Sequence, residues 1–229
     1  MRAKNSVFTK QTFQFFRELR RNNHRLWMDE NRYRYRECIV EPCRCFLQEL
    51  APDLLRVNPE FDLTGKTGVN FSRINRDIRF AKDKTPYKTQ MYIKVQCPRP
   101  DKTETGQLYL GVSHDAVTVG FRIYSGEKRK TSALALVAEP RVLANPKWVA
   151  QQKKRLSRSY ESYWYAMVKG EWTKHKGWPV TTEDWKRIRA WIVRKKVAPG
   201  QATRAEFRAQ VLKVFKDLYP LLKFTAIPD

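Results

Sequence analysis

Residues 71–97, FSRINRDIRFAKDKTPYKTQMYIKVQC, decide the fold class of this chain. From Tyr87 to Cys97, apolar side chains alternate with basic, polar and aromatic ones. Since successive side chains of a strand point to opposite faces, this alternation predicts a strand with one apolar face and one basic, aromatic face. Pro86 pushes the residue before it away from helical backbone, so the pattern also predicts a turn directly before the strand.

The first part of the same stretch, residues 71–80, fits two backbone conformations. A helix would stack Arg73, Arg76 and Arg79, whereas a strand would place Arg76 on the face opposite to the other two. Two glycines lead into this segment and a clear strand follows it, so we expect extended structure.

The two-residue period continues beyond this strand. It predicts strands around residues 108–112 and 117–123, joined by a short turn at 113–115. Such closely spaced strands pair as hairpins, so the three strands are expected to form an antiparallel meander. A further short strand is expected at 163–168.

Helical signals fill the rest of the chain. Residues 1–60 show helical periodicity, and Thr9 is expected to begin the first helix as its N-cap. The helices expected after the meander lie at 132–138, at 146–155, from Thr182 to Ala198, and from a capping box at 203–206 to Pro220.

Together these elements predict an α+β fold, an antiparallel β-meander with N-terminal and C-terminal helices packed on it. One domain over residues 1–229 is expected, because 229 residues with 41% hydrophobic side chains suit one sizeable core. Its parts are a helical layer at 1–60, an antiparallel sheet with a basic hairpin at 61–125, and a mainly helical part with one short strand at 126–229.

The net charge restricts the choice of partners. Lys and Arg number 46 against 23 Asp and Glu, which gives a formal charge of +23. Such a charge attracts nucleic acid, anionic membranes or acidic proteins without choosing among them. The aromatic content of 13% argues against a disordered basic tail.

The sequence favours a cytoplasmic protein that does not span a membrane. Its four cysteines are too few and too clustered for a disulfide-stapled secreted domain. The N-terminus has no apolar core of signal-peptide length. The longest apolar run, at 133–138, is far too short to cross a bilayer.

The basic residues of 71–89 suit a negatively charged ligand. Arg makes bidentate contacts with phosphate or carboxylate, and Lys supplies a mobile point charge. The residues expected to bind phosphate are Arg73, Arg76, Arg79, Lys82, Lys84 and Lys88. We expect Asp77 and Asp83 to orient these cations; the alternative is that both carboxylates simply pair with cations on a solvated hairpin. Phe80 and Tyr87 are expected to support the hairpin from the core side.

Residues 71–89 resemble the signature F-R-I-x-R-D-x-R-F-x-K-D-K-x-P-Y-K-T of the family catalogued as domain of unknown function 2461. Residues 22–42 resemble the N-terminal segment of the same family. The matching positions there are Asn22, Asn23, Trp27, Asn31, Tyr35 and Pro42. The chain departs from the family at Met28, where the family has an aromatic residue, and at 120–124. The resemblance implies a shared α+β fold and a shared basic signature, and it brings no activity with it.

The sequence carries few signs of catalysis or cofactor binding. Asp83 and Lys84 are adjacent and would face opposite sides of a strand, unlike the acidic residue and Lys of a metal-dependent nuclease strand. The His and Cys residues show no metal-ligand spacing, so no metal is expected. No phosphate-binding glycine loop, nucleophile elbow or dinucleotide fingerprint occurs, so no cofactor is expected. These signs do not decide whether the chain is an enzyme.

Basic and aromatic residues outside the hairpin suit nucleic acid. The possible contacts are Tyr92, Lys94, Arg122, Lys186, Arg187, Arg194 and Lys195. We therefore expect a basic protein that binds the backbone of RNA or DNA without strong sequence specificity. Two alternatives stay open: an enzyme that holds a small phosphorylated or carboxylated substrate in the Arg/Lys cradle, and an interaction module for an acidic protein surface.

Overall fold

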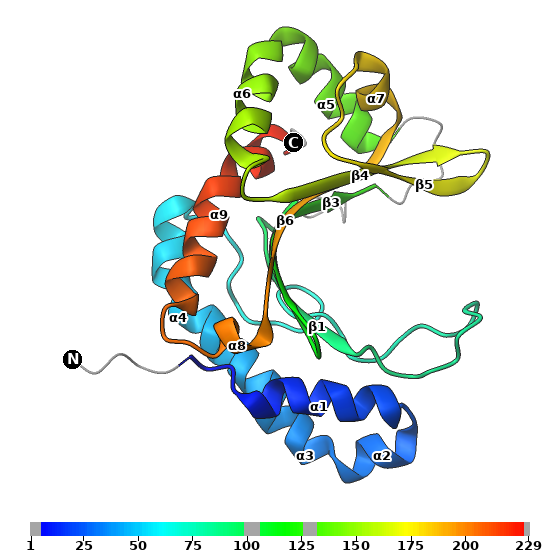
Figure 1. Ribbon diagram of the computed structural model, residues 1–229, viewed down its shortest axis with the longest axis vertical. Coiled ribbons are helices and arrows are strands. Elements are labelled where there is room, and N and C mark those ends of the chain that lie inside the picture. Colours follow the sequence, from blue (N-terminus) through cyan, green and yellow to red (C-terminus); the bar gives the residue numbers. More distant parts are fainter. Residues whose placement is uncertain (1–5, 99–105, 126–131, 227–229) are drawn as a thin grey trace. The chain divides into compact units, whose positions relative to one another are not determined.

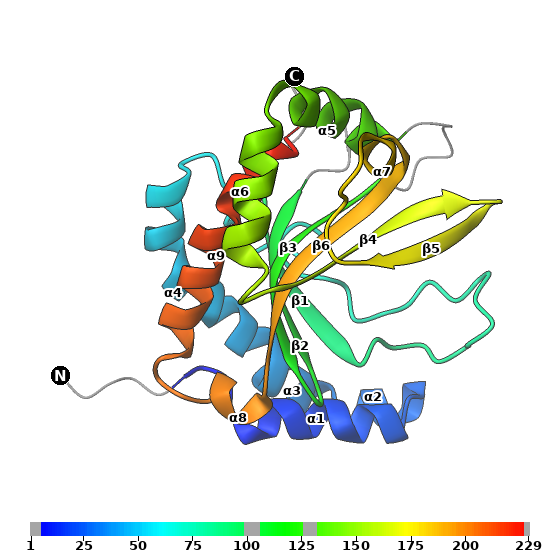
Figure 2. The ribbon, with the colours of Figure 1, turned by 45° about the horizontal axis from the view of Figure 1, so that its top comes forward.

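The computed structural model describes residues 6–98, 106–125 and 132–226, and it confirms the α+β class (Figure 1). The strands are β1 (Gln90–Val95), β2 (Gln107–Ser113), β3 (Val117–Tyr124), β4 (Glu161–Val168), β5 (Glu171–Lys176) and β6 (Ile188–Val197). They form one antiparallel sheet in the order β1-β2-β3-β6-β4-β5. The first three strands follow the expected meander, whereas β6 lies between β3 and β4 (Figure 2).

The chain folds as two compact units. Unit 1 comprises Met1–Val95, Tyr109–Val119 and Lys196–Lys213. Unit 2 comprises Gln96–Leu108, Gly120–Lys195 and Val214–Asp229. The single domain expected over residues 1–229 stays a prediction.

Unit 1 begins with the expected helical layer. The helices of this layer are α1 (Lys10–Arg21), α2 (Arg25–Glu30), α3 (Arg32–Tyr35), the π-helical turn η1 (Arg36–Val40) and α4 (Glu41–Val57). Unit 1 also contains the short helix α8 (Pro199–Ala202). Thr9 is the N-cap of α1, as expected, and its backbone N–H donates to Thr12 Oγ1 at 3.3 Å. The Phe8 ring lies 5.1 Å from that of Phe46 and 6.1 Å from that of Phe207, between centroids. These buried rings hold the N-terminus, α4 and the start of α9 (Phe207–Phe224) together.

Residues 70–75, here the edge segment, run beside β1 in extended form. Ser72 N–H donates to Tyr92 O at 3.0 Å, and Tyr92 N–H donates to Ser72 Oγ at 3.0 Å. Further along, Lys94 N–H donates to Asn70 O at 2.7 Å. The edge segment forms isolated bridges instead of a continuous ladder. The extended structure expected over residues 71–80 is therefore confirmed for residues 71–75, without a full strand, whereas residues 76–80 are irregular chain.

Unit 2 is built around tryptophans. Its helices are α5 (Ala133–Ala144), α6 (Pro146–Leu156) and α7 (Thr182–Arg187). Trp191 on β6 is fully buried, and its ring centroid lies 4.9 Å from that of Trp178 and 5.3 Å from that of Trp185. Phe121 on β3 packs against it edge-on at 5.7 Å. Edge-to-face aromatic packing of this kind adds to the burial of the rings.

The helix expected from Thr182 to Ala198 is wrong. It ends as the short α7, and Ile188–Val197 forms strand β6. The first six residues of β6 are all buried, and all of them except Arg189 are apolar. Apolar side chains therefore face both sides of the sheet, and the strand shows no two-residue alternation. Gly120 fits against this strand, because a Cβ there would lie 2.4 Å from Val193 O. Among the described residues after 126, β4, β5 and β6 make three strands and not the single one expected.

The end expected for the last helix at Pro220 is also wrong. α9 continues through this proline to Phe224. Leu221 and Leu222 are buried, and Thr225 N–H donates to Leu221 O at 3.1 Å to close the last turn. The apolar burial offsets the one backbone hydrogen bond that a proline removes from a helix.

Candidate functional site

The basic signature forms a loop that is closed at its base. Residues 76–86, here the arm, leave and return to unit 1 where Asn75 and Tyr87 form an antiparallel bridge. Arg76 N–H donates to Pro86 O at 2.8 Å, and Lys88 N–H donates to Ile74 O at 2.8 Å. Figure 1 shows the arm reaching away from β1 as irregular chain.

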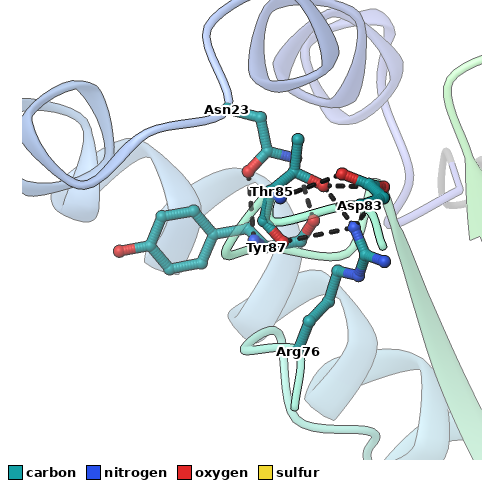
Figure 3. A network of polar contacts seen from close by, with 5 residues as sticks. All are labelled: Asn23, Arg76, Asp83, Thr85 and Tyr87. Carbon is teal, nitrogen blue, oxygen red and sulfur yellow. Dashed lines mark hydrogen bonds and ion pairs between the residues drawn. The ribbon is translucent and has the colours of Figure 1, made fainter. Parts of the chain in front are cut away.

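Asn23, between α1 and α2, fixes the base of the arm (Figure 3). Its Nδ2 donates to Tyr87 O at 2.8 Å, and Tyr87 N–H donates to Asn23 Oδ1 at 3.0 Å. Tyr87 is 7% exposed, which confirms its expected place on the core side. The Asn23 amide thus makes the two hydrogen bonds to the Tyr87 backbone that a neighbouring strand would make. It connects residues 22–42 with residues 71–89, the two stretches that resemble the family.

Arg76 closes the arm from inside. Its Nη1 donates to Asp83 Oδ2 at 2.5 Å, to Thr85 O at 3.2 Å and to Thr85 Oγ1 (Figure 3). Asp83 also accepts from Thr85 N–H at 2.9 Å. That backbone N–H, followed by the Arg76 guanidinium, lowers the pKa of Asp83 to about 2. Asp83 is therefore charged at neutral pH and orients Arg76 toward the arm itself.

Two more cations of the signature contact the arm. Arg79 Nη2 lies 2.7 Å from Asp77 Oδ2, and this hydrogen-bonded pair lowers the pKa of Asp77. Lys84 Nζ donates to Ile78 O at 3.0 Å. Asp77 and Asp83 each pair with a cation on an exposed loop. This is the arrangement expected if the two carboxylates only pair with cations on a solvated hairpin. An anion-binding role for Arg76, Arg79 and Lys84 stays a prediction.

The remaining cations of the signature have a different environment. In the part of the chain that the structure describes, the side chains of Arg73, Lys82 and Lys88 make no hydrogen bond or ion pair. Phe80 near the arm's tip is 95% exposed, so the expectation that it supports the arm from the core side is wrong. The Arg79 guanidinium lies 5.9 Å from the centre of the Phe80 ring.

The possible nucleic-acid contacts are dispersed over both units. Lys94 Nζ donates to Gly68 O at 2.7 Å, and the Tyr92 hydroxyl donates to Gln90 Oε1 at 3.1 Å. Arg122 Nε donates to Gln107 Oε1 at 3.3 Å. The two cations of α7 are ion-paired, Lys186 with Glu139 at 3.8 Å and Arg187 with Glu183 and Asp184 at 3.7 Å each. Lys195 is exposed.

Arg194 is different, because it borders a cluster of aromatic and basic side chains in unit 2. In the antiparallel register, Tyr163 lies opposite Lys176 and Tyr165 opposite Lys174, and Met167 lies opposite Trp172. Residues that are opposite each other in such a pair share one side of the sheet. We call this side the aromatic face and define it by Tyr163, Tyr165, Trp172, Lys174, Lys176 and Arg194.

Cations and rings touch on the aromatic face. Lys174 Nζ lies 4.1 Å from the centre of the Tyr163 ring, and the Arg194 guanidinium lies 5.1 Å from it. Arg194 also pairs with Glu161. Tyr165 packs edge-on against Trp172 at 5.9 Å, and Trp172 is 45% exposed. The rings are therefore held in place, the two tyrosines are half-buried, and the indole of Trp172 remains open to solvent.

Sequence reasoning identified Arg194 but not the rest of the aromatic face. Tyr163 and Tyr165 lie in the strand that was expected at 163–168, and their alternation with buried Trp164 was visible. Lys174 and Lys176 come from β5, for which no strand was expected. Only the pairing of β5 with β4 brings them beside the tyrosines.

The described residues offer no group of three His, Cys, Asp or Glu side chains that could hold a metal ion. His24 caps α2 by accepting from Trp27 N–H, and the His175 ring stacks on Trp164 at 4.2 Å. None of the four cysteines, all of which lie in the described part of the chain, forms a disulfide. Among the described helices, none has the length and apolar character needed to cross a membrane.

Comparison with known proteins places the chain in a family. No curated protein matches it. A family model described as "Conserved hypothetical protein (DUF2461)" matches residues 11–224, which include most of the helical layer, the arm and the aromatic face. The chain therefore belongs to the DUF2461 family, as the resemblance of its basic signature indicates.

Proposed function

We propose that this protein binds the backbone of RNA or DNA without strong sequence specificity, and that the aromatic face is its contact surface. The observation that supports this most directly is the interleaving of Tyr163, Tyr165 and Trp172 with three cations. Proteins that bind single strands combine cations for the phosphates with aromatic rings on which bases stack.

The charges of the aromatic face favour an anionic ligand. It carries Lys174, Lys176 and Arg194, and the paired Glu161 offsets one of these charges. The net charge of +23 adds a long-range attraction that is independent of sequence. The neutral rings distinguish this face from the ion-paired cations of α7, which have already found carboxylate partners.

A reducing compartment, with the cytoplasm as the expected location, is part of the proposal. Cys38, Cys43, Cys45 and Cys97 form no disulfide, and Cys45 is exposed. Exposed thiols persist in the reduced form where glutathione and thioredoxin are active.

A salt titration of binding to labelled single- and double-stranded RNA and DNA of several sequences tests the proposal. We expect tighter binding to single strands and a linear fall of log affinity with log salt. Lys174→Ala/Lys176→Ala should reduce the slope for single strands by about 1.4, since each lost phosphate contact removes about 0.7. Lys153→Ala/Lys154→Ala on α6 makes the same change in charge outside the aromatic face and should leave more of the slope.

An aromatic substitution separates stacking from charge. Trp172→Ala should weaken single-strand binding by roughly 5- to 150-fold, because one base stacked on a ring contributes about 1–3 kcal/mol. Phe80→Ala removes another exposed ring, from the arm, and serves as the matched control. Equal binding by all four variants and the wild type, or no binding of any nucleic acid at low salt, would overturn the proposal.

A further inference from the structure

A second site lies at the base of the arm, in unit 1. A pocket of about 230 Å³, here the arm-base pocket, opens between Tyr35 and Cys43 of the helical layer on one side and residues 71–75 on the other. Met91 of β1 also lines the pocket. Its two sides come from the two stretches that resemble the family, at Tyr35 and at Arg73.

The lining of this pocket combines apolar walls with hydrogen-bond donors. Phe71, Ile74 and Met91 are buried and supply apolar surface. Two arginines, Arg44 and Arg73, are among the polar residues that line it. No Asp or Glu occurs among the residues that line the pocket. Such a set favours a ligand that is apolar in part and negatively charged at one end.

Arg73 is the cation best placed to hold that charge. The Arg73 side chain makes no ion pair or hydrogen bond with the described residues. Arg44 differs, because its Nη1 lies 3.4 Å from Glu41 Oε1 in an ion pair. A guanidinium presents a planar fork that matches a carboxylate in two hydrogen bonds. Arg73 is therefore available to a ligand without the loss of an existing contact.

The Tyr35 hydroxyl adds a neutral donor. Burial raises the pKa of Tyr35 to about 12, so the phenol keeps its proton at neutral pH. Within the described residues this hydroxyl has no hydrogen-bond partner. Burial likewise raises the pKa of the Cys43 thiol to about 12, which leaves it a neutral wall and not a nucleophile.

We propose that the arm-base pocket binds a small carboxylate with a compact apolar body, held by the Arg73 guanidinium and the Tyr35 hydroxyl. The size fits, since a cavity of about 150 Å³ holds benzene and this pocket is larger. Apolar walls favour a monocarboxylate over a phosphate dianion, which needs more donors to replace its water. The pocket belongs to unit 1 and the aromatic face to unit 2, so this proposal does not depend on nucleic-acid binding.

Calorimetric titration of the full chain with benzoate, isovalerate and hydrocinnamate tests the pocket. We expect saturable binding of at least one, and a loss of about 10- to 100-fold in Arg73→Gln, because a hydrogen bond to a charged group contributes about 1.5–3 kcal/mol. Arg79→Gln removes a neighbouring cation that does not line the pocket and should bind as the wild type does. Tyr35→Phe should weaken binding less than Arg73→Gln does.

Two controls keep non-specific attraction to a basic protein apart from the pocket. Benzyl alcohol, which lacks the charge, should bind far more weakly than benzoate. Benzoate should shift the backbone amide signals of Ser72 and Asn75 in a titration followed by NMR. Equal affinity of the Arg73 and Arg79 variants, tighter binding of inorganic phosphate than of any carboxylate, or no saturation at millimolar ligand would overturn the proposal.

Discussion

Asn23→Ala should release the arm from unit 1. The substitution removes both hydrogen bonds between the Asn23 amide and the backbone of Tyr87, at 2.8 and 3.0 Å. An intramolecular hydrogen bond contributes about 0.5–1.5 kcal/mol net, so the loss should be about 1–3 kcal/mol. The upper end applies because Tyr87 is buried, and its N–H and C=O are then left without partners.

Amide hydrogen exchange is the assay that locates this loss. The amides of Arg76 and Lys88 close the base of the arm, so their exchange reports its opening. A loss of 1–3 kcal/mol corresponds to exchange that is about 5- to 150-fold faster at these two positions. Amides of the α1 interior should change much less, because the arm opens without unfolding the helical layer.

Asn23→Asp provides the control. It keeps an acceptor for Tyr87 N–H but, when ionised, places a second acceptor against Tyr87 O. Its exchange at Arg76 and Lys88 should therefore slow as the pH falls and the carboxyl group gains a proton that it can donate. If Asn23→Ala leaves exchange at Arg76 and Lys88 unchanged and alters the free energy of unfolding by less than about 0.5 kcal/mol, the size expected for an ordinary surface change, the Asn23 amide does not hold the arm.

Three further predictions follow from single contacts. The pKa of Asp83 is lowered from 3.8 to about 2, so the stability that its charge gives the arm is present above about pH 4 and is lost as the pH falls toward 2. The NMR shift of the Thr85 amide should follow this titration in the wild type and should not titrate in that pH range in Asp83→Asn. Phe80→Ala should change the free energy of urea unfolding by less than about 0.5 kcal/mol, since the ring is exposed, and a larger loss would show that the ring packs. Gly120→Ala should destabilise by about 1–3 kcal/mol, because its Cβ would meet Val193 O, and an unchanged thermal midpoint would contradict this close approach.

The parts of the fold that sequence predicts are those with a local signal. The alternation at β1, β2 and β3 and the N-cap at Thr9 depend on neighbours a few residues away, and each was found where expected. Strand β6 was not, because a strand covered on both faces has the same apolar run as a buried helix. Only its partners on the two sides, β3 and β4, distinguish the two.

In the candidate site, too, contacts between residues close in sequence could be predicted and contacts between distant residues could not. The pairing of Asp77 and Asp83 with nearby cations follows from spacing, and the arm contains both pairs. The contact between Asn23 and Tyr87 spans 64 residues, and the meeting of Tyr165 with Lys174 requires a register that no single strand encodes. Phe80 was misplaced because an aromatic residue usually signals burial, and nothing in the neighbouring sequence marks it as exposed.

The edge segment beside β1 has a consequence for how the protein resists self-association. The outermost strand of an open sheet offers unpaired backbone groups on which another chain can add a strand. Here the backbone of Asn70 and the hydroxyl of Ser72 already occupy Lys94 N–H and Tyr92 N–H. At the opposite end of the strand order, β5 carries Lys174 and Lys176, and charged side chains of this kind deter an incoming strand. At the β1 edge, backbone groups are thus already hydrogen-bonded, and at the β5 edge, charged side chains oppose strand addition. A high concentration of the folded protein should therefore not start cross-β fibres.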